Sequence, residues 1–247
     1  MKSRNYLVSV PLTLCTNQYA FSYGSHGWHY WRDLVIQFRE DPDNSIEQMR
    51  YYKFFQRCQT SSYTCLMSFH DENLRANLPR LPFGSYPWGN FDSQFSPDTD
   101  RFDDTSKDRS NQNYMWFETG STVDKVLRKE FEVTVRLLKS IVRIGYRPKI
   151  TSRNSPFPVC TILKERSGDV RFVQMSGAHR LAVLSALGHT RAVVQFDLDR
   201  YPPILEEEVE NWPYVRNGLI SKSAALRFFN LYFSLNGTER ASALGCI

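Results

Sequence analysis

The sequence lacks any hydrophobic run long enough to cross a membrane. A membrane helix needs about 20 consecutive apolar residues, and no window of this chain approaches that length. The apolar stretch near the first residue, 6–12, is also too short and too interrupted for the core of a signal peptide. These absences predict a soluble, cytoplasmic protein with no membrane span.

The sequence also lacks a cysteine pattern. Its five cysteines are odd in number, and none forms a CxxC pair or stands close to a histidine. This argues against a disulfide framework and against a structural zinc site, and it predicts a reducing compartment. The net charge of +5 is modest. It suits a phosphate-bearing ligand but falls short of what dedicated nucleic-acid binders carry, so a nucleic-acid partner is not expected.

The length of 247 residues suits one large domain or two small ones. Residues 1–90 are rich in aromatics, with helical spacing in 28–39 and 45–57, and we interpret the aromatics as a packing face. The alternative is an aromatic platform for sugars or bases. Gly, Pro, Ser, Asp and Asn dominate residues 84–122, which predicts a polar loop or linker. We expect the nucleotide-binding core domain over residues 123–200 and helices over the C-terminal residues 201–247.

The core region has a clear order of elements. Apolar spacing predicts a helix from Thr122 that ends at Gly145, where a left-handed residue belongs. Residues 159–163 and 170–175 predict a strand hairpin around the turn 165–169. A helix over 178–187, stopped by Gly188, and a strand over 192–196 follow. This predicts an α+β fold that contains a small βαβ-type unit.

The informative turn joins the second strand to the short helix. It reads Ser176-Gly177-Ala178-His179-Arg180. A glycine there allows a sharp turn and admits a ligand close to the main chain. The first helical N–H groups lack partners, the helix dipole favours an anion, and Arg180 offers a planar fork to phosphate oxygens. The turn therefore predicts a phosphate site. The alternative is that Gly177 only turns the chain, His179 packs inside and Arg180 pairs with a surface acid.

Residues 125–197 resemble the ParB/sulfiredoxin superfamily. The matching pieces, in order, are Ser140-Ile141-Val142-Arg143-Ile144-Gly145, Pro148, the two strands, Gly177-Ala178-His179-Arg180 and Ala186-Leu187-Gly188. The resemblance implies a small mixed sheet with helices and a nucleotide whose phosphates lie near the turn. Members of that superfamily include ParB proteins that bind CTP and DNA, sulfiredoxins that use ATP, and kinases that phosphorylate free serine.

The chain departs from each of these groups. Sulfiredoxins carry a reactive cysteine where this chain has Ala178, and the kinases commonly carry an aspartate where it has Ser176. The acidic run 206–208 stands where ParB proteins place a DNA-reading motif, which fits DNA poorly. The aromatic N-terminal half resembles, more faintly, bacterial proteins associated with surface-polysaccharide synthesis.

We therefore expect an ATP-dependent, kinase-like phosphotransferase that acts on a hydroxyl of a small molecule or sugar. The resemblance implies a catalytic glutamate on the helix that precedes the strands, which points to Glu130 or Glu132. Two residues apart, they face different sides of the helix, so only one faces the site, and we prefer Glu132. His179 or Arg180 would stabilise the transferred charge. Because ATP usually binds together with Mg²⁺, we expect this ion as well, and Asp169 is a possible ligand for it.

Other interpretations stay open. Both glutamates are alternatively exposed helix residues. The protein is alternatively a non-catalytic, ParB-like nucleotide-responsive binding protein with a DNA or protein partner. The serine at 176 favours that alternative, whereas the lack of a DNA-reading motif favours the enzyme. Two histidines, His26 and His29, stand three residues apart near a predicted helix start, and we interpret them as structural rather than metal-binding.

Overall fold

The computed structural model describes residues 5–58, 86–89, 121–148 and 156–247. Their strands are β1 (Asn5–Pro11), β2 (Cys15–Thr16), β3 (Val159–Lys164), β4 (Val170–Ser176), β5 (Arg191–Asp197) and β6 (Ile204–Leu205). Their α-helices are α1 (Tyr30–Glu40), α2 (Arg50–Arg57), α5 (Ser121–Ile144), α6 (Ala178–Ala186), α7 (Pro213–Arg216), α8 (Lys222–Ser234) and α9 (Thr238–Ala243). Short 3-10 helices are η1 (Leu12–Leu14), η2 (Ile46–Gln48) and η6 (Glu206–Asn211). The expected α+β class with a mixed sheet is confirmed.

The strands form one sheet in the order β1-β5-β3-β4-β2, with β6 beside β3. The predicted hairpin is confirmed, since β3 and β4 pair antiparallel. The predicted βαβ-type unit is wrong in its strand arrangement. Because β3 lies between β4 and β5, antiparallel to the first and parallel to the second, the two strands joined by α6 run in opposite directions.

Residues from the N-terminal region join this sheet. β1 pairs antiparallel with β5 from Asn5 opposite Asp197 to Pro11 opposite Arg191, and β2 adds to the far edge beside β4. One hydrophobic cluster, on one face of the sheet, contains side chains from 10–58 and from 127–196. Most of the expected linker, 84–122, lies outside the described residues. The residues on either side of it share one sheet and one core.

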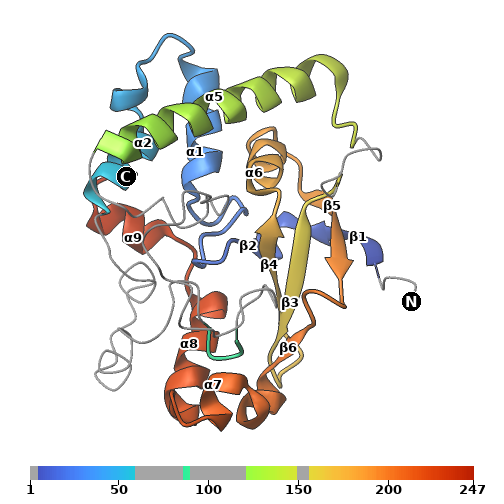
Figure 1. Ribbon diagram of the computed structural model, residues 1–247. Helices are drawn as coiled ribbons and strands as arrows, with labels where there is room; N and C mark the ends of the chain where they lie inside the picture. The colour runs from blue at the N-terminus through green and yellow to red at the C-terminus, as the bar shows by residue number, and fades with distance from the viewer. Residues whose placement is uncertain (1–4, 59–85, 90–120, 149–155) are drawn as a thin grey trace, which may run out of the picture.

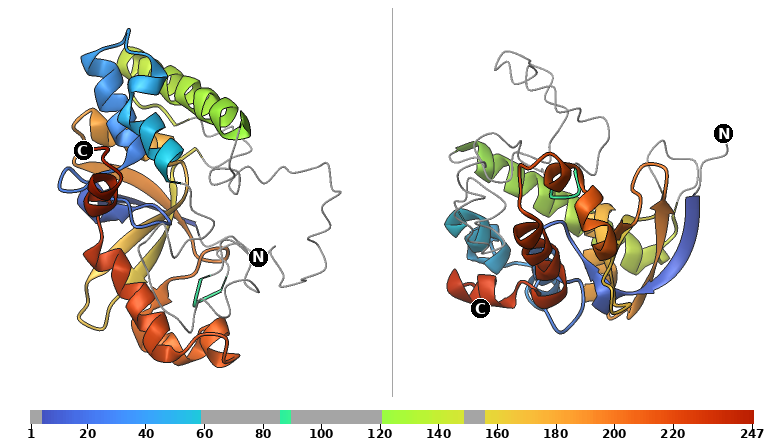
Figure 2. Two further views of the ribbon diagram at one scale, coloured as in Figure 1. Left: turned by 90° about the vertical axis from the view of Figure 1, so that its left-hand side faces the viewer. Right: turned by 90° about the horizontal axis from the view of Figure 1, so that it is seen from below.

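Alternation along the central strands gives the sheet two covered faces. Phe172 of β4 packs against the hydrophobic cluster that also contains side chains of α1, α2, α5 and α6, whereas its neighbour Val173 belongs to a second cluster with side chains of η6, α7 and α8. Figure 2, at left, shows the first group of helices above the sheet and the helices α7 and α8 below it. The sheet therefore lies between two helical layers, and α6 with the end of β4 is on the side shared with α5 and α1.

The aromatic-rich helical region packs as expected. Phe21, Tyr30, Phe54 and Phe55 meet edge-to-face or stacked, with ring centroids 5.0–5.7 Å apart. These side chains are buried, so in the described structure they form core rather than a surface platform.

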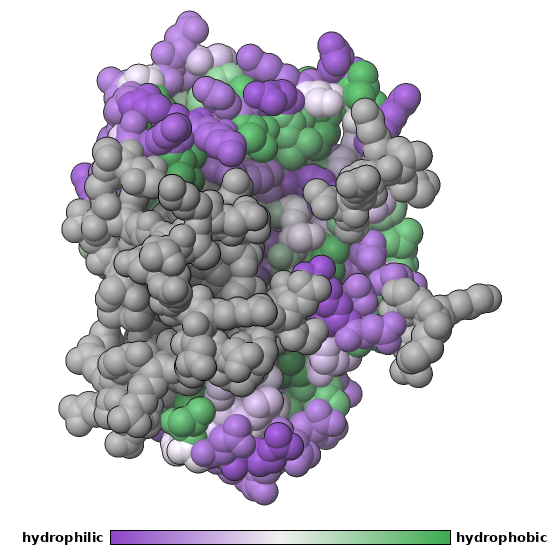
Figure 3. Space-filling model, viewed as in Figure 1, coloured by the Kyte–Doolittle hydropathy of each residue, from purple (hydrophilic) through white to green (hydrophobic). Residues whose placement is uncertain are grey.

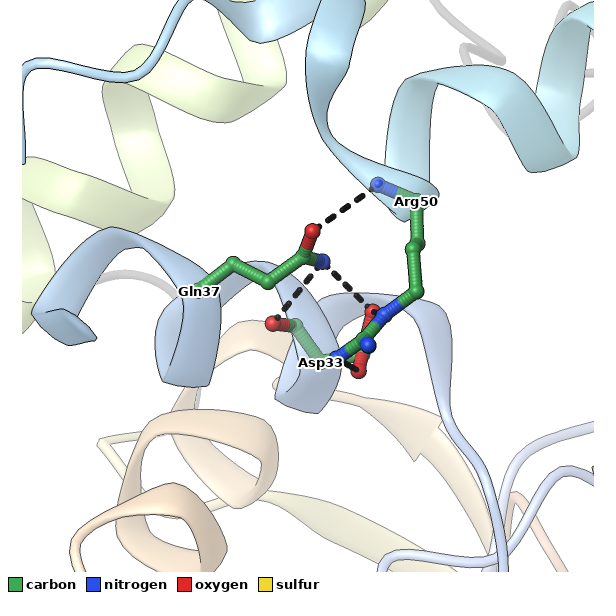
Figure 4. Close-up of polar contacts among 3 residues, drawn as sticks. All are labelled: Asp33, Gln37 and Arg50. Atoms are coloured by element: carbon green, nitrogen blue, oxygen red, sulfur yellow. Dashed lines mark hydrogen bonds and ion pairs between the residues drawn. The ribbon is translucent and has the colours of Figure 1, made fainter. Parts of the chain in front are cut away.

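A cluster of three polar residues, Asp33, Gln37 and Arg50, joins α1 to α2 (Figure 4). The carboxylate of Asp33, which is buried, accepts two hydrogen bonds from the Arg50 guanidinium at 2.6 and 2.9 Å. Gln37 donates to the same carboxylate at 2.6 Å and accepts from the Arg50 backbone N–H at 3.1 Å. These bonds to Asp33 raise the pKa of Arg50. This cluster of hydrogen bonds holds α2 in place against α1, and α1 in turn packs against α6.

Candidate functional site

The turn from β4 into α6 forms as the sequence predicts. β4 ends at Ser176, Gly177 adopts a left-handed conformation with φ of 79°, and α6 begins at Ala178. Gly177 is the N-cap residue, and no side chain caps the helix there. The start of α6 is therefore an uncapped, electropositive helix end of the kind that favours anions.

The space beside Gly177 differs from the expectation that it admits a ligand. A Cβ at this position would lie 2.8 Å from Pro158 Cα and 3.0–3.1 Å from the Arg180 guanidinium nitrogens. Protein atoms of the preceding loop and of the same turn therefore fill the side on which a side chain would stand. The glycine is required here by close backbone approach and by its positive φ.

Arg180 folds back over the turn. Its Nη1 donates to the Pro156 carbonyl at 2.5 Å. Tyr146, which follows α5, donates to the same carbonyl at 3.4 Å, and Arg180 also hydrogen-bonds to this tyrosine. Burial raises the pKa of Tyr146, and Arg180 partly offsets that rise. Arg180 thus joins the end of α5, the loop before β3 and the start of α6.

His179 faces α5. Its Nε2 lies 2.9 Å from Glu130 Oε2, with 24% of the histidine side chain and 16% of the glutamate side chain exposed. Nε2 makes no hydrogen bond to a described residue, so the contact with the carboxylate oxygen is a close approach without hydrogen-bond geometry. The Trp31 ring of α1 meets the imidazole edge-to-face at 4.3 Å between centroids. Three helices therefore converge on His179.

The two candidate glutamates have different surroundings. Glu130 lies on the buried stripe of α5 that runs through Leu127, Thr134 and Leu138, and its own carbonyl accepts a hydrogen bond from Thr134 at 2.7 Å. Glu132 is exposed to solvent. The structure therefore brings Glu130, and not the preferred Glu132, to His179. The sequence could have indicated Glu130, because residues 127, 130, 134, 138 and 141 lie on one face of a helix. Recognising that face requires Thr134 to be counted among the buried residues.

Asp169 is not near the turn. It lies in the loop that joins β3 to β4, where it accepts a hydrogen bond from Ser167 at 3.2 Å. The seven residues of β4 separate it from Gly177, which corresponds to roughly 20 Å of extended strand. The structure therefore does not bring this candidate Mg²⁺ ligand to the turn. Among the described residues, no three His, Cys, Asp or Glu side chains come together as a metal site.

A second histidine, His29, lies at the start of α1, two residues before Trp31. His29 is fully buried, caps α1 by accepting the Trp31 backbone N–H at 3.2 Å through Nδ1, and stacks on Tyr23 at 4.1 Å. Burial, and then the nearby His179 and Arg32, hold the pKa of His29 well below its usual 6.5. The imidazole is therefore neutral, with its proton on Nε2, which has no hydrogen-bond partner among the described residues. The structural interpretation of His29 fits this place, and Trp31 is the residue near the site that sequence reasoning counted only as core.

Comparison with family models, curated proteins and solved structures found no match. No helix in the described part of the chain is both long and apolar enough to span a bilayer.

Proposed function

We propose that the chain binds the phosphates of a nucleotide at the start of α6 and transfers a phosphoryl group from ATP to a hydroxyl of a small molecule or saccharide. The observation that carries the proposal is the contact between Glu130 and His179, one residue into α6. It sets a carboxylate and an imidazole, the two side chains most used as general bases, next to a helix end that favours anions.

In this proposal the acceptor hydroxyl gives its proton to the Glu130–His179 pair. The hydroxyl oxygen then forms a bond to the γ-phosphorus, and the bond from that phosphorus to the bridging oxygen breaks, which releases ADP. The α6 amides and the Arg180 guanidinium would hold phosphate oxygens and stabilise the charge. Mg²⁺ would arrive with ATP, since this ion is commonly held by phosphates, waters and few protein ligands.

The resemblance to the ParB/sulfiredoxin superfamily supports the nucleotide, and its kinase-like members support the reaction. The faint resemblance of the N-terminal half to proteins of surface-polysaccharide synthesis favours a saccharide acceptor. ATP as the donor implies a cytoplasmic location.

A second candidate is a non-catalytic, nucleotide-responsive binding protein. The observation in its favour is that Arg180 donates to the Pro156 carbonyl and that protein atoms fill the space beside Gly177. Nucleotide binding at this turn would have to displace the Arg180 guanidinium from that carbonyl. Such a rearrangement of the loop before β3 would signal occupancy to a partner without any chemistry.

Calorimetric titration with ATP and Mg²⁺, followed by an assay for ADP with monosaccharides, nucleotide sugars and serine as acceptors, separates the candidates. We expect Arg180→Ala to weaken ATP binding by about tenfold or more, because a charge-assisted hydrogen bond is lost. Arg166→Ala is the matched control, since Arg166 is an exposed arginine in the β3–β4 loop, far from the turn. Binding without ADP formation would favour the binding protein, and failure to bind any nucleotide would reject both.

A further inference from the structure

β1 is an edge strand whose outer side is unprotected. It pairs with β5 on one side, and no other strand of the described part of the chain lies beyond it (Figure 1). Edge strands are usually blocked by charged side chains, by proline or by a bulge. β1 has no charged residue, its register with β5 is regular, and its proline, Pro11, is its last residue. The outer side of β1 can therefore accept another strand.

The middle of β1 exposes apolar side chains on both faces of the sheet. Tyr6 is 53% exposed, Leu7 is 56% exposed and Val8 is 43% exposed. Because side chains alternate along a strand, Tyr6 and Val8 lie on one face and Leu7 on the other. Figure 3 shows apolar surface at the right-hand side of the molecule, at the level of β1 in Figure 1. A strand added at the edge would contact the side chains of both faces at once, whereas a flat surface would reach those of one face.

The hydrogen bonds between β1 and β5 show which backbone groups of β1 point outward. Just beyond the strand, the Leu12 N–H donates to the Thr190 carbonyl at 2.9 Å, in the register of the β1–β5 pairs. Hydrogen-bonded pairs alternate with non-hydrogen-bonded pairs along an antiparallel ladder. Val8 therefore directs its N–H and C=O toward β5, and Leu7 directs its own away from the sheet.

One side chain already occupies part of this edge. The same alternation turns the Ser9 carbonyl outward, and Arg191 donates to it at 2.6 Å and to the Ser9 hydroxyl at 3.2 Å. The least obstructed backbone groups are therefore those of Leu7. A carbonyl oxygen has two lone pairs, so the Ser9 carbonyl can still accept a hydrogen bond from a second strand.

We propose that β1 pairs with β1 of a second copy of this chain, antiparallel and about a two-fold axis at Leu7, so that the two sheets become one. The two copies of Leu7 lie opposite each other and exchange their N–H···O=C hydrogen bonds. Tyr6 then lies opposite Val8 of the second copy, an aromatic and β-branched pair that is favourable across strands. Asn5 lies opposite Ser9, so a polar side chain meets a polar one. Each side chain of this stretch meets one of its own kind and no like charges meet, which selects a second copy as the occupant.

The neighbouring registers are less favourable. With the axis at Val8, Leu7 would face Ser9 of the second copy, an apolar side chain opposite a polar one. The Arg191 guanidiniums that bind the two Ser9 carbonyls would then both lie close to the axis and repel each other. With the axis at Ser9, Leu7 would face Pro11, which has no N–H to donate.

Sedimentation equilibrium of the full chain over a range of concentrations tests the proposal. We expect a reversible equilibrium between monomer and dimer. Leu7→Lys should weaken dimerisation by about tenfold or more, because it sets two ammonium groups opposite each other across the axis. Leu7→Pro should weaken it to a similar extent, because it removes the N–H groups that the two copies exchange, whereas that N–H makes no ladder bond within one copy.

Val133→Lys is the matched control, since Val133 is an exposed aliphatic side chain on α5 and not on the sheet edge. It should dimerise like the parent chain. Oxidative cross-linking reports the register: Leu7→Cys should form a disulfide between two copies, because the Cα atoms of a hydrogen-bonded antiparallel pair lie about 5.5 Å apart. Val133→Cys and the parent chain should not form this cross-link.

Thermal unfolding shows which variants are folded, and the Leu7→Cys result stands even if the lysine or proline variant fails to fold. A parent chain that stays monomeric at every concentration would overturn the proposal and leave the edge to a strand of another protein. A dimer that is unchanged in Leu7→Lys and Leu7→Pro would overturn it as well. So would a dimer in which Leu7→Cys forms no cross-link.

Discussion

Glu130 and His179 meet across the interface of α5 and α6, with 2.9 Å between Oε2 and Nε2. They are 49 residues apart in the chain (179 − 130), and both side chains are half-buried. The pair makes the proposed chemistry testable, because Glu132 on the same helix is an exposed carboxylate two residues away.

Glu130→Gln should lower kcat for ADP formation by about a hundredfold, since it removes the proton acceptor while keeping the shape of the side chain. Glu132→Gln should leave kcat unchanged. Steady-state kinetics with saturating ATP measures both. If Glu132→Gln has the larger effect, the assignment of the base to Glu130 is wrong.

Gly177→Ala should destabilise the protein more than Gly188→Ala. Both glycines have positive φ, 79° and 87°, so each alanine costs about 1 kcal/mol of backbone strain. Only at Gly177 does the added Cβ also lie 2.8 Å from Pro158 Cα, whereas at Gly188 it meets nothing within 4 Å. Urea unfolding should show a loss of about 3 kcal/mol or more at Gly177. Equal losses at the two positions would contradict the close approach of Pro158.

His29 should make the protein less stable in acid. Its folded-state pKa lies well below 6.5, so below that pH the unfolded chain takes up a proton that the folded chain does not. The free energy of unfolding should therefore fall by up to about 1.4 kcal/mol per pH unit below 6.5, until the folded-state pKa is reached.

His29→Asn should flatten that pH dependence, because asparagine keeps a capping side chain but does not titrate. The comparison is of slopes between about pH 7 and about pH 5 in urea unfolding, since loss of the stack on Tyr23 also lowers stability at every pH. His26→Asn, at an exposed histidine, is the control. An unchanged slope in His29→Asn would show that another group governs acid sensitivity.

Asp33→Ala should cost about 2 kcal/mol, because a buried carboxylate that joins α1 to α2 is lost and Arg50 and Gln37 lose their acceptor. Arg128→Ala should leave stability nearly unchanged, since its ion pairs with Glu47 and Asp124 are exposed to solvent. Thermal unfolding of the two variants checks this. A larger loss in Arg128→Ala would mean that the exposed ion pairs contribute more than their exposure implies.

Several elements could be predicted from the sequence because neighbouring residues decide them. The apolar spacing of α5, the left-handed Gly145 after it and the hairpin of β3 and β4 all formed as expected. The turn at Gly177 and the start of α6 also formed as expected, since a glycine between a strand and an apolar helix can take the left-handed conformation that a sharp turn requires.

The tertiary structure decided what depends on residues far apart in the chain. β1 pairs with β5, about 190 residues later, and β3 enters between the strands that α6 joins; no local pattern encodes either pairing. The position of Glu130 rather than Glu132 beside His179, the hydrogen bond from Arg180 to the Pro156 carbonyl and the burial of His29 follow from how α1, α5 and α6 pack. Propensity and capping act over a few residues, whereas a side chain's surroundings are set by whichever distant elements pack against it.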